Sequence, residues 1–199
     1  MAEKNVVQTI HDTLQEEMKR DDRTIVLGED VGARGGVFRV TMGFLDEFGP
    51  ERVIDTPLDE CLIAGVSIGL ALDGMKPIAE MQFADFIFPA FNQIVQEAAR
   101  IRYRSNGDFG VPMVIRAPYG GGVHGALYHS QSIEAFFAHV PGLKVVVPST
   151  PYDAKGMLIQ AIDAKTVTTV TRVAAGRIRR ARRAQNAPSE NPPETRTSR

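Results

Sequence analysis

A proline-centred run of acids is the first place in this sequence where chemistry is expected. Residues 55–60 read DTPLDE; they follow a short apolar segment at 52–54 and precede a long apolar segment at about 61–72. Pro57 suits a turn or the first position of a helix, and acids in a first helical turn complement the helix dipole. Asp59 is therefore assigned a structural role at the start of a helix.

Glu60 has two interpretations that the residues alone leave open. The helix predicted after it has apolar residues and glycines on several faces, so it is expected to be closely packed. A carboxyl group beside such a helix loses hydration, which favours its protonated form. Glu60 is then either part of the helix start or an acid that shares a proton with a ligand near neutral pH.

Two histidines lie in a glycine-rich stretch at residues 117–131, and a loop of this length within a compact domain is usually functional. His124 is assigned a structural role. His129 lies just before a predicted helix, where it can serve as a general acid or donor near pH 7. The neighbouring Ser130 lacks the G-x-S-x-G setting of a hydrolase nucleophile, and the histidine spacings do not match zinc sites.

Two further segments carry candidate residues. Phe86 can stack on a flat ring, although an aromatic between Asp85 and Ile87 is assigned first to the core. The glycine-rich segment 28–36 lacks the G-x-G-x-x-G fingerprint. Its acids, at positions 29 and 30, would repel a diphosphate, so this segment is not expected to cradle phosphates.

Regular alternation of helix and strand patterns must position these residues. Helices are predicted at 3–20, before 48, and at 61–72, 91–104, 132–137 and 151–162, and strands at 24–27, 52–54, 76–81, 111–115 and 143–147. Short apolar strands in this alternation predict an α/β fold, a doubly wound and mainly parallel sheet with helices on both faces. Right-handed crossovers place all carboxyl ends of the strands at one edge, where ligands bind. The four candidate segments are therefore expected to converge on one crevice.

The composition changes at about residue 162. From residue 163 onward nine Lys or Arg stand against three acids, a charge of +6, so residues 1–162 carry −7. Residues 163–173 include a β-branched run that predicts an added strand. Residues 174–199 are Arg-rich with one Ile and no aromatic, and they are predicted to be disordered. Without interleaved aromatics or a known motif in this tail, nucleic-acid binding is the least favoured function.

Bulk properties indicate an ordinary globular protein, with 43% hydrophobic and 24% charged residues. No apolar run is long enough to span a bilayer, and the N-terminus does not resemble a signal peptide. The single cysteine, Cys61, excludes an internal disulfide and a cysteine metal cluster. These features predict a reducing, cytoplasmic location.

Five motifs in one register then give the sequence a family resemblance over about residues 4–162. They are GEDVG at 28–32, DTPLDE at 55–60, FADFIFPAFNQ at 83–93, GGGVHGALYHSQ at 120–131 and PGLKVVVP at 141–148. The chain resembles the β subunit of the E1 component of 2-oxo acid dehydrogenase complexes. The third and fourth motifs are most similar to branched-chain members, and pyruvate dehydrogenase members remain an alternative.

The resemblance implies a thiamine diphosphate enzyme assembled as an α2β2 heterotetramer, with a transketolase-like pyrimidine-binding domain at residues 1–162. In this family the α subunit holds the diphosphate and Mg²⁺, and the β subunit holds the aminopyrimidine. Glu60 matches the glutamate on the pyrimidine N1′, whose shared proton helps to generate the reactive cofactor. Phe86 matches the aromatic that packs on the pyrimidine, and Leu58 falls in the same cofactor site.

The resemblance also implies a second partner and a second ion. His129 matches the histidine that assists acyl transfer to the lipoyl arm of the E2 core. Met113, Ala161 and Ile162 fall where family members hold a structural K⁺ through backbone carbonyls.

The match ends at Ile162, where the family continues with an Arg-Asp-x-x-Pro turn, a strand and a second domain. Residues 163–167 read DAKTV instead, so the resemblance implies a truncated chain. Two functions follow. The first is a β subunit for oxidative decarboxylation of a branched-chain 2-oxo acid, in branched-chain amino acid catabolism in the bacterial cytoplasm. The second is a non-catalytic remnant or subunit-interaction module.

Overall fold

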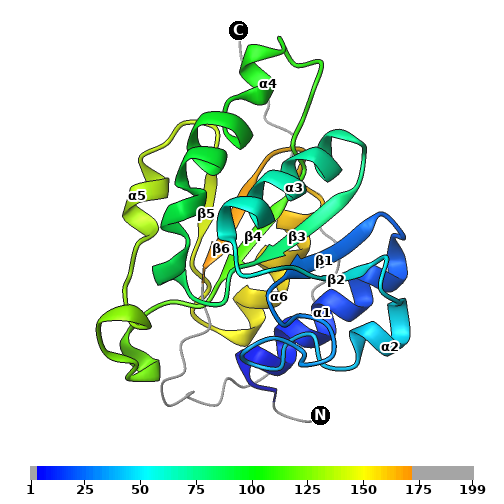
Figure 1. Cartoon of the computed structure of the whole chain (residues 1–199), viewed down its shortest axis with the longest axis vertical. Helices are drawn as coiled ribbons and strands as arrows, with labels where there is room; N and C mark the ends of the chain where they lie inside the picture. The colour runs from blue at the N-terminus through cyan, green and yellow to red at the C-terminus, as the bar shows by residue number, and fades with distance from the viewer. Residues whose placement is uncertain (1–3, 172–199) are drawn as a thin grey trace, which may run out of the picture.

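The computed structural model describes residues 4–171 and builds them around a parallel sheet (Figure 1). Within these residues six strands lie in the order β2-β1-β3-β4-β6-β5. Their bounds are β1 Thr24–Gly28, β2 Val53–Asp55, β3 Lys76–Glu80, β4 Val114–Ala117, β5 Lys144–Val146 and β6 Thr168–Thr171. The longer helices are α1 Val6–Arg20, α3 Glu60–Leu72 and α6 Pro151–Ile162, and the shorter ones are α2 Phe44–Phe48, α4 Ile101–Arg104 and α5 Glu134–Ala138.

The register of the sheet aligns the ends of four neighbouring strands, β2, β1, β3 and β4. Gly28 at the end of β1 pairs with Asp55 of β2 and with Glu80 of β3, and Glu80 pairs with Arg116 of β4. All of these pairings are parallel, so the segments that follow these strands begin side by side. Glu80 and Arg116 form a buried ion pair in this row.

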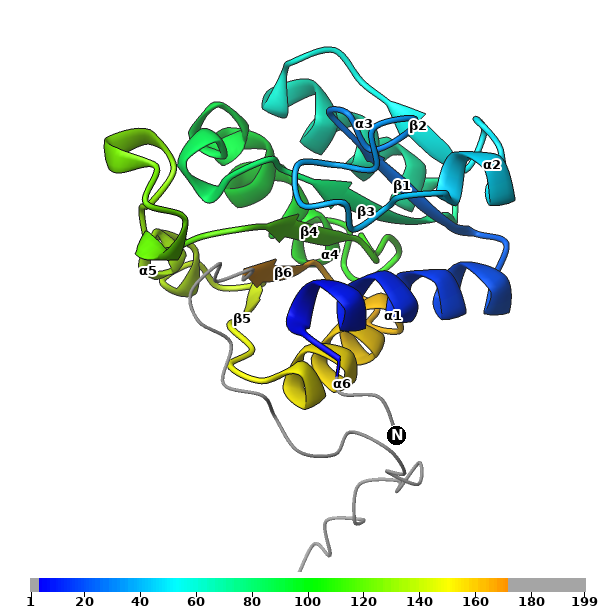
Figure 2. The same ribbon diagram turned by 90° about the horizontal axis from the view of Figure 1, so that it is seen from below.

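Helices cover both faces of the sheet. Helices α1 and α6 lie together on one face, and α3 lies on the other (Figure 2). The first face is filled by a core cluster that includes Leu14, Met18 and Leu158. The opposite face is filled by a second cluster that includes Ile63 and Phe137. Each fully buried side chain of this size contributes about 1.5–3 kcal/mol, so the two layers hold the strand ends in a fixed frame.

The predicted α/β fold with a doubly wound parallel sheet is confirmed, with differences in detail. Strand β4 begins at Val114 rather than at 111, and β5, expected to be buried, is an exposed to half-buried edge strand. The cause is β6, which pairs with both β4 and β5 and so leaves β5 at the edge. The helix predicted at 91–104 is divided, because residues 93–98 form a π-helix and only 101–104 form α4.

Two other predictions concern the end of the chain and the membrane. The strand expected within 163–173 corresponds to β6. The disorder predicted for 174–199 lies outside the described residues. Over residues 4–171, no helix has the length and apolar character needed to cross a bilayer.

Candidate functional site

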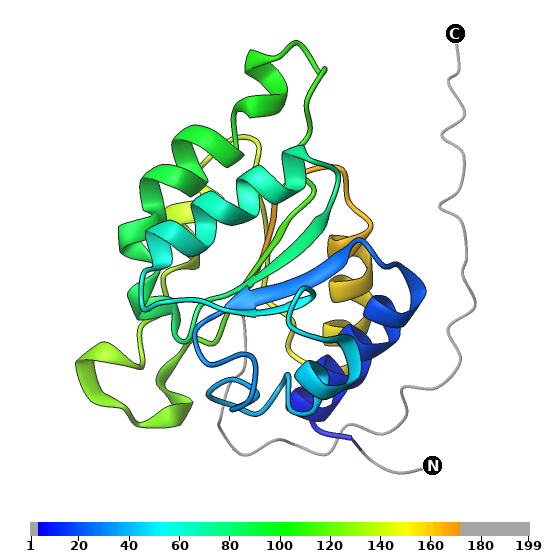
Figure 3. The same ribbon diagram turned by 45° about the vertical axis from the view of Figure 1, so that its right-hand side comes forward.

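The four segments that leave the carboxyl ends of β1 to β4 lie at one edge of the sheet (Figure 3), and each of them contacts at least one other. The backbone N–H of Gly32, after β1, donates to Oδ1 of Asp55, at the end of β2, over 2.7 Å. Gln82, after β3, donates from Nε2 to Oδ2 of Asp30 over 3.3 Å. These contacts join the first segment to the second and the third, and ring contacts described below join the third to the fourth.

Glycine is required where the first segment touches its neighbours. A Cβ at Gly32 would lie 2.5 Å from Oδ2 of Asp55, which no real Cβ approaches. Gly36 adopts a left-handed φ of 76°, and a Cβ there would lie 2.9 Å from Oε1 of Glu80. The segment therefore lies directly on the strand ends, and these two glycines allow its backbone to approach them closely.

Glu60 is the first residue of α3 and is only 7% exposed. Asp59 is the N-cap of this helix, and its carboxylate accepts the N–H of Leu62 over 3.0 Å. The structural role predicted for Asp59 is thus confirmed. The Glu60 carboxyl group has no hydrogen-bond or ion-pair partner within residues 4–171. The Glu60 oxygens are not among the fully enclosed atoms without a partner, as Oε1 of Glu29 is, so this largely buried carboxyl group remains accessible to a ligand or partner.

Glu29, which immediately follows β1, is a second buried acid at the same place. Its side chain is 6% exposed, and Oε1 is buried without a hydrogen-bond partner among the described residues. Burial raises the pKa of Glu29, and the charges of Glu60 and Asp30 raise it further. Glu29 therefore holds its proton more tightly than a free glutamate does, and a carboxyl group with a raised pKa beside a second acid is a feature of functional sites.

Sequence reasoning missed this role of Glu29, because it used the residue only as an argument against a diphosphate. The signal that was available is position. An acid directly after a short apolar strand stands at the carboxyl edge of the sheet, where the adjacent turn already supplied Glu60.

His129 packs among the phenylalanines of the third segment. Its ring centroid lies 4.5 Å from that of Phe83 and 5.3 Å from that of Phe86, with planes at 90° and 88°. Phe86 and His129 are both half-buried, whereas Phe83 is buried and also contacts Phe38 of the first segment at 5.7 Å. The structure thus brings Phe86 and His129 together, and Phe86 is less buried than a core residue. His124 is exposed on the same loop.

The remaining predicted residues are dispersed. Leu58 lies in the turn before α3 and is 80% exposed. Met113 belongs to the core cluster on one face of the sheet, and Ala161 and Ile162 belong to the cluster on the other. The carbonyl of Ala161 accepts the N–H of Ala164 over 3.3 Å at the end of α6. The potassium site stays a prediction, and no group of three metal-binding His, Cys, Asp or Glu side chains occurs in the described part of the chain.

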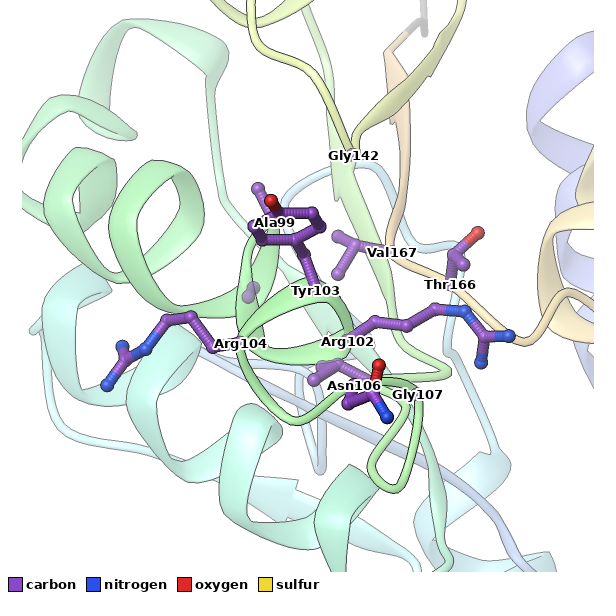
Figure 4. A pocket seen from close by; sticks show the side chains of 11 residues that line it. Ala99, Arg102, Tyr103, Arg104, Asn106, Gly107, Gly142, Thr166 and Val167 are labelled. Atoms are coloured by element: carbon purple, nitrogen blue, oxygen red, sulfur yellow. The ribbon is translucent and has the colours of Figure 1, made fainter.

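A cavity of about 700 Å³ lies elsewhere (Figure 4). It is lined by α4 residues such as Tyr103, by Val111 before β4, and by Thr166 and Val167 before β6. Those strands begin at this cavity, so it lies at the amino edge of the sheet, opposite the buried acids. The hollow and the candidate chemistry therefore occupy different edges of the fold.

The carboxyl edge has the chemical character of a site for a flat, nitrogen-rich ring. Glu29 and Glu60 are buried acids with no donor among residues 4–171, and the half-buried ring of Phe86 lies in the segment after β3 at the same edge. The nearby charged groups are mainly acidic, and Arg34 of the same loop pairs with Asp30 at 3.5 Å. These residues therefore fit the aminopyrimidine of thiamine diphosphate and do not fit its diphosphate.

Comparisons with known proteins identify the family of this domain. Residues 2–174 match the family described as "Transketolase, pyrimidine binding domain". The chain is 65% identical over 162 residues to the 2-oxoisovalerate dehydrogenase subunit beta of Bacillus subtilis, covering 81% of this chain and 50% of that protein. It is 50% identical over 163 residues to the pyruvate dehydrogenase E1 component subunit beta of Acholeplasma laidlawii, covering 82% and 50%. The chain thus spans about half the length of these relatives.

A solved structure shares the fold alone. It is described as "Split gene transketolase, inactive beta4 tetramer" and superposes with a TM-score of 0.68 at 20% identity, covering 86% of this chain and 52% of that one. The resemblance to E1 β subunits that the five motifs indicated is confirmed. By its family match, its relatives and its fold, the chain belongs to the transketolase pyrimidine-binding domains, in the form that E1 β subunits of 2-oxo acid dehydrogenases carry.

Proposed function

We propose that this chain supplies the aminopyrimidine side of a thiamine diphosphate site in the E1 component of a 2-oxo acid dehydrogenase. The observation that carries the proposal is the pair of buried acids, Glu29 and Glu60, with no protein donor for the Glu60 carboxyl group within residues 4–171. The cofactor, when bound, would supply a nucleophilic carbon that attacks the 2-oxo group of the substrate. Glu60 would hold a proton at the pyrimidine N1′.

Phe86 and His129 would have separate roles, one toward the cofactor and one toward the acyl acceptor. The half-buried ring of Phe86 would pack on the pyrimidine, with exposed Leu58 contributing from the turn before α3. His129 is half-buried at the margin of the domain, so it would be reached by a lipoyl arm arriving from solvent. It would donate a proton during acyl transfer to that arm.

The substrate would be a branched-chain 2-oxo acid rather than pyruvate. Support comes from the identity of 65% to a 2-oxoisovalerate dehydrogenase β subunit against 50% to pyruvate dehydrogenase β subunits. The place of such an enzyme is branched-chain amino acid catabolism in the bacterial cytoplasm. Pyruvate remains the second substrate to test.

The site would be completed by partners. The acidic first segment leaves the diphosphate and its Mg²⁺ to an E1 α subunit, in an α2β2 heterotetramer that delivers the acyl group to a lipoyl E2 core. The exposed position of Leu58 is consistent with a cofactor shared between two chains. A K⁺ ion at the carbonyls of Met113, Ala161 and Ile162 would be structural only.

Reconstitution tests this function. The purified chain is mixed with the E1 α subunit, thiamine diphosphate and Mg²⁺, and reduction of an artificial acceptor is followed with 3-methyl-2-oxobutanoate and with pyruvate. We expect turnover, with the larger kcat/KM for the branched-chain substrate. A complex that forms but does not turn over would instead favour the alternative function, a subunit-interaction module. That alternative is kept because the chain matches only half the length of its relatives.

A further inference from the structure

Asp85 is a buried acid that the proposed function leaves unused. It lies in the connection after β3 and is 8% exposed. Within residues 4–171 its carboxylate forms no ion pair, and its partners are backbone groups of the fourth segment. Oδ1 accepts the N–H of Ser130 and the N–H of Gln131, each over 3.3 Å, and Oδ2 accepts the N–H of Gln131 over 3.4 Å. Because a buried carboxylate is costly without donors, these contacts fix the two partners to each other.

The segment that Asp85 holds is the loop at residues 118–131, called here the His loop. Its first residue is held by the neighbour of Asp85, since the N–H of Ala84 donates to the carbonyl of Pro118 over 2.7 Å. The last residue of the loop is bonded to its beginning, since the N–H of Gly120 donates to the carbonyl of Gln131 over 3.0 Å. Both ends of the loop are therefore fastened to residues 84–85.

The tip of the loop is weakly held. Tyr119, at the base, packs against the core, and Nε2 of Gln131 donates to the carbonyl of Leu127 over 3.0 Å. Leu127 and Tyr128 are 76% and 67% exposed, and the loop projects from the sheet (Figure 3). His124 and Ala126 both have a φ of 57°, a left-handed conformation that costs a non-glycine residue about 1–2 kcal/mol. A loop with this backbone and so little burial needs contacts outside itself to keep one conformation.

The contact with Asp85 bears directly on the imidazole. His129 immediately precedes Ser130, and a Cβ at Gly125 would lie 2.3 Å from the Cβ of His129. The imidazole is thus confined between the backbone at Gly125 and the rings of Phe83 and Phe86. Release of the N–H groups of Ser130 and Gln131 would release the residue that comes just before them.

We propose that Asp85 is a positioning residue whose carboxylate holds the His loop and keeps the imidazole of His129 against Phe83 and Phe86. The effect of this positioning on acyl transfer rests on the proposed function. The contact that holds the loop does not. Asp85 touches neither substrate nor cofactor in this account; it acts through the backbone N–H groups of Ser130 and Gln131.

The test begins with the chain alone. In Asp85→Ala both N–H groups lose their acceptor, so amide hydrogen exchange in residues 126–131 should rise about tenfold to a hundredfold. The ring-proton NMR signals of His129, assigned with a His129→Gln variant, should move toward the chemical shifts of a free imidazole. The reason is that the imidazole loses its contacts with the rings of Phe83 and Phe86. Asp85→Asn keeps one acceptor oxygen, so the His129 signals and the exchange of Ser130 should return to near wild type. A smaller rise in exchange should remain at Gln131, whose N–H contacts both oxygens of Asp85.

Thr150→Ala is the matched control. Thr150 is also a side-chain acceptor for a backbone N–H, that of Asp153 over 3.1 Å, but it caps α6. It should leave exchange at 126–131 and the His129 signals unchanged. Unchanged exchange and unchanged His129 signals in Asp85→Ala would overturn the proposal. If Asp85→Ala does not fold, Asp85→Asn decides, because Gln131 contacts both oxygens and its exchange must rise.

The assembled α/β enzyme separates positioning from general damage. Acyl transfer to a lipoyl domain should fall more than about tenfold in Asp85→Ala, because a misplaced proton donor forfeits part of a general-acid contribution of about 100-fold or more. Reduction of an artificial acceptor, which does not require His129, should fall far less. Equal losses in the two assays would refute the positioning of His129. An inactive wild-type enzyme would remove the proposed function, and the exchange experiment would still decide the role of Asp85.

Discussion

The two halves of the carboxyl edge hold their chemical groups in different ways. On the β1–β2 side, Glu60 is the first residue of a 13-residue helix that begins five residues after β2 ends. On the β3–β4 side, His129 lies far along a loop that contains only short 3₁₀ turns. Glu60 is positioned by regular structure and an N-cap, and His129 is positioned by contacts with another segment, through Asp85 and the phenylalanine rings.

This difference separates the two expected activities. Proton transfer to one fixed atom of a bound cofactor requires a donor in a fixed position. A carboxyl group at the start of a rigid helix meets that requirement. Acyl transfer to a mobile arm requires a donor at the margin of the domain, and a loop provides that exposure. The rigid acid and the loop-borne imidazole thus match two steps with different geometric demands.

The largest expected effect comes from exchanging the two groups for amides. Glu60→Gln removes the shared proton, so artificial-acceptor reduction by the α/β enzyme should fall about 100-fold to 10,000-fold, while circular dichroism shows an unchanged fold. His129→Gln should leave that assay nearly unchanged and reduce lipoyl acylation. The comparison is broken if Glu60→Gln retains wild-type turnover, or if both variants lose both activities alike.

The fold was predictable because each strand and helix is indicated by a pattern among neighbouring residues of the sequence. Apolar strand segments, a proline-acid turn and the Thr150-Pro151 start of α6 all follow from neighbouring residues. The errors concern interactions between distant residues. The edge position of β5 depends on β6 entering beside β4, and the π-helix at 93–98 arises within the packed layer that contains Ile94 and Val95.

The site divides in the same way. Glu60 could be found from its own sequence neighbourhood, because strand, turn, acid and helix are consecutive. The raised pKa of Glu29 could not, because its two largest causes, burial and the charge of Glu60, arise only in the folded chain. The anchoring of Ser130 and Gln131 by Asp85 joins residues 45 and 46 positions apart, and no periodic pattern reports such a contact.

A smaller effect is expected on stability from Glu29→Gln. The pKa of Glu29 is raised above its ordinary value of 4.5 by burial and by Glu60 and Asp30, so the folded chain binds more protons than the unfolded chain. Stability therefore falls as pH rises from 4.5 through the raised folded pKa, and the penalty is complete above it. Gln carries no such penalty, so the Tm of the variant should exceed that of the wild type at neutral pH by about 2–4 °C for each kcal/mol relieved.

A pH series of thermal melts measures this difference. The Tm advantage of Glu29→Gln should disappear below pH 4.5, where the wild-type carboxyl group is protonated in both states. Glu51→Gln, at an exposed acid before β2, provides the control and should show no such trend. If the Tm difference between Glu29→Gln and the wild type did not change with pH, the ionisation of Glu29 beside Glu60 would not be its cause.

The smallest effect is expected at the helix start that fixes Glu60. Asp59→Ala removes the acceptor for the N–H of Leu62 and should cost about 1 kcal/mol, or about 2–4 °C in Tm. Asp59→Asn keeps a capping oxygen and should stay within a few tenths of a kcal/mol. Because the turn, the strand before it and the packed face of α3 still hold the backbone, acceptor reduction by Asp59→Ala should fall far less than in Glu60→Gln. A loss as large as that of Glu60→Gln would show that the cap, rather than the layer beneath it, positions the acid, and Glu60 would then depend on a single local contact just as His129 is proposed to depend on Asp85.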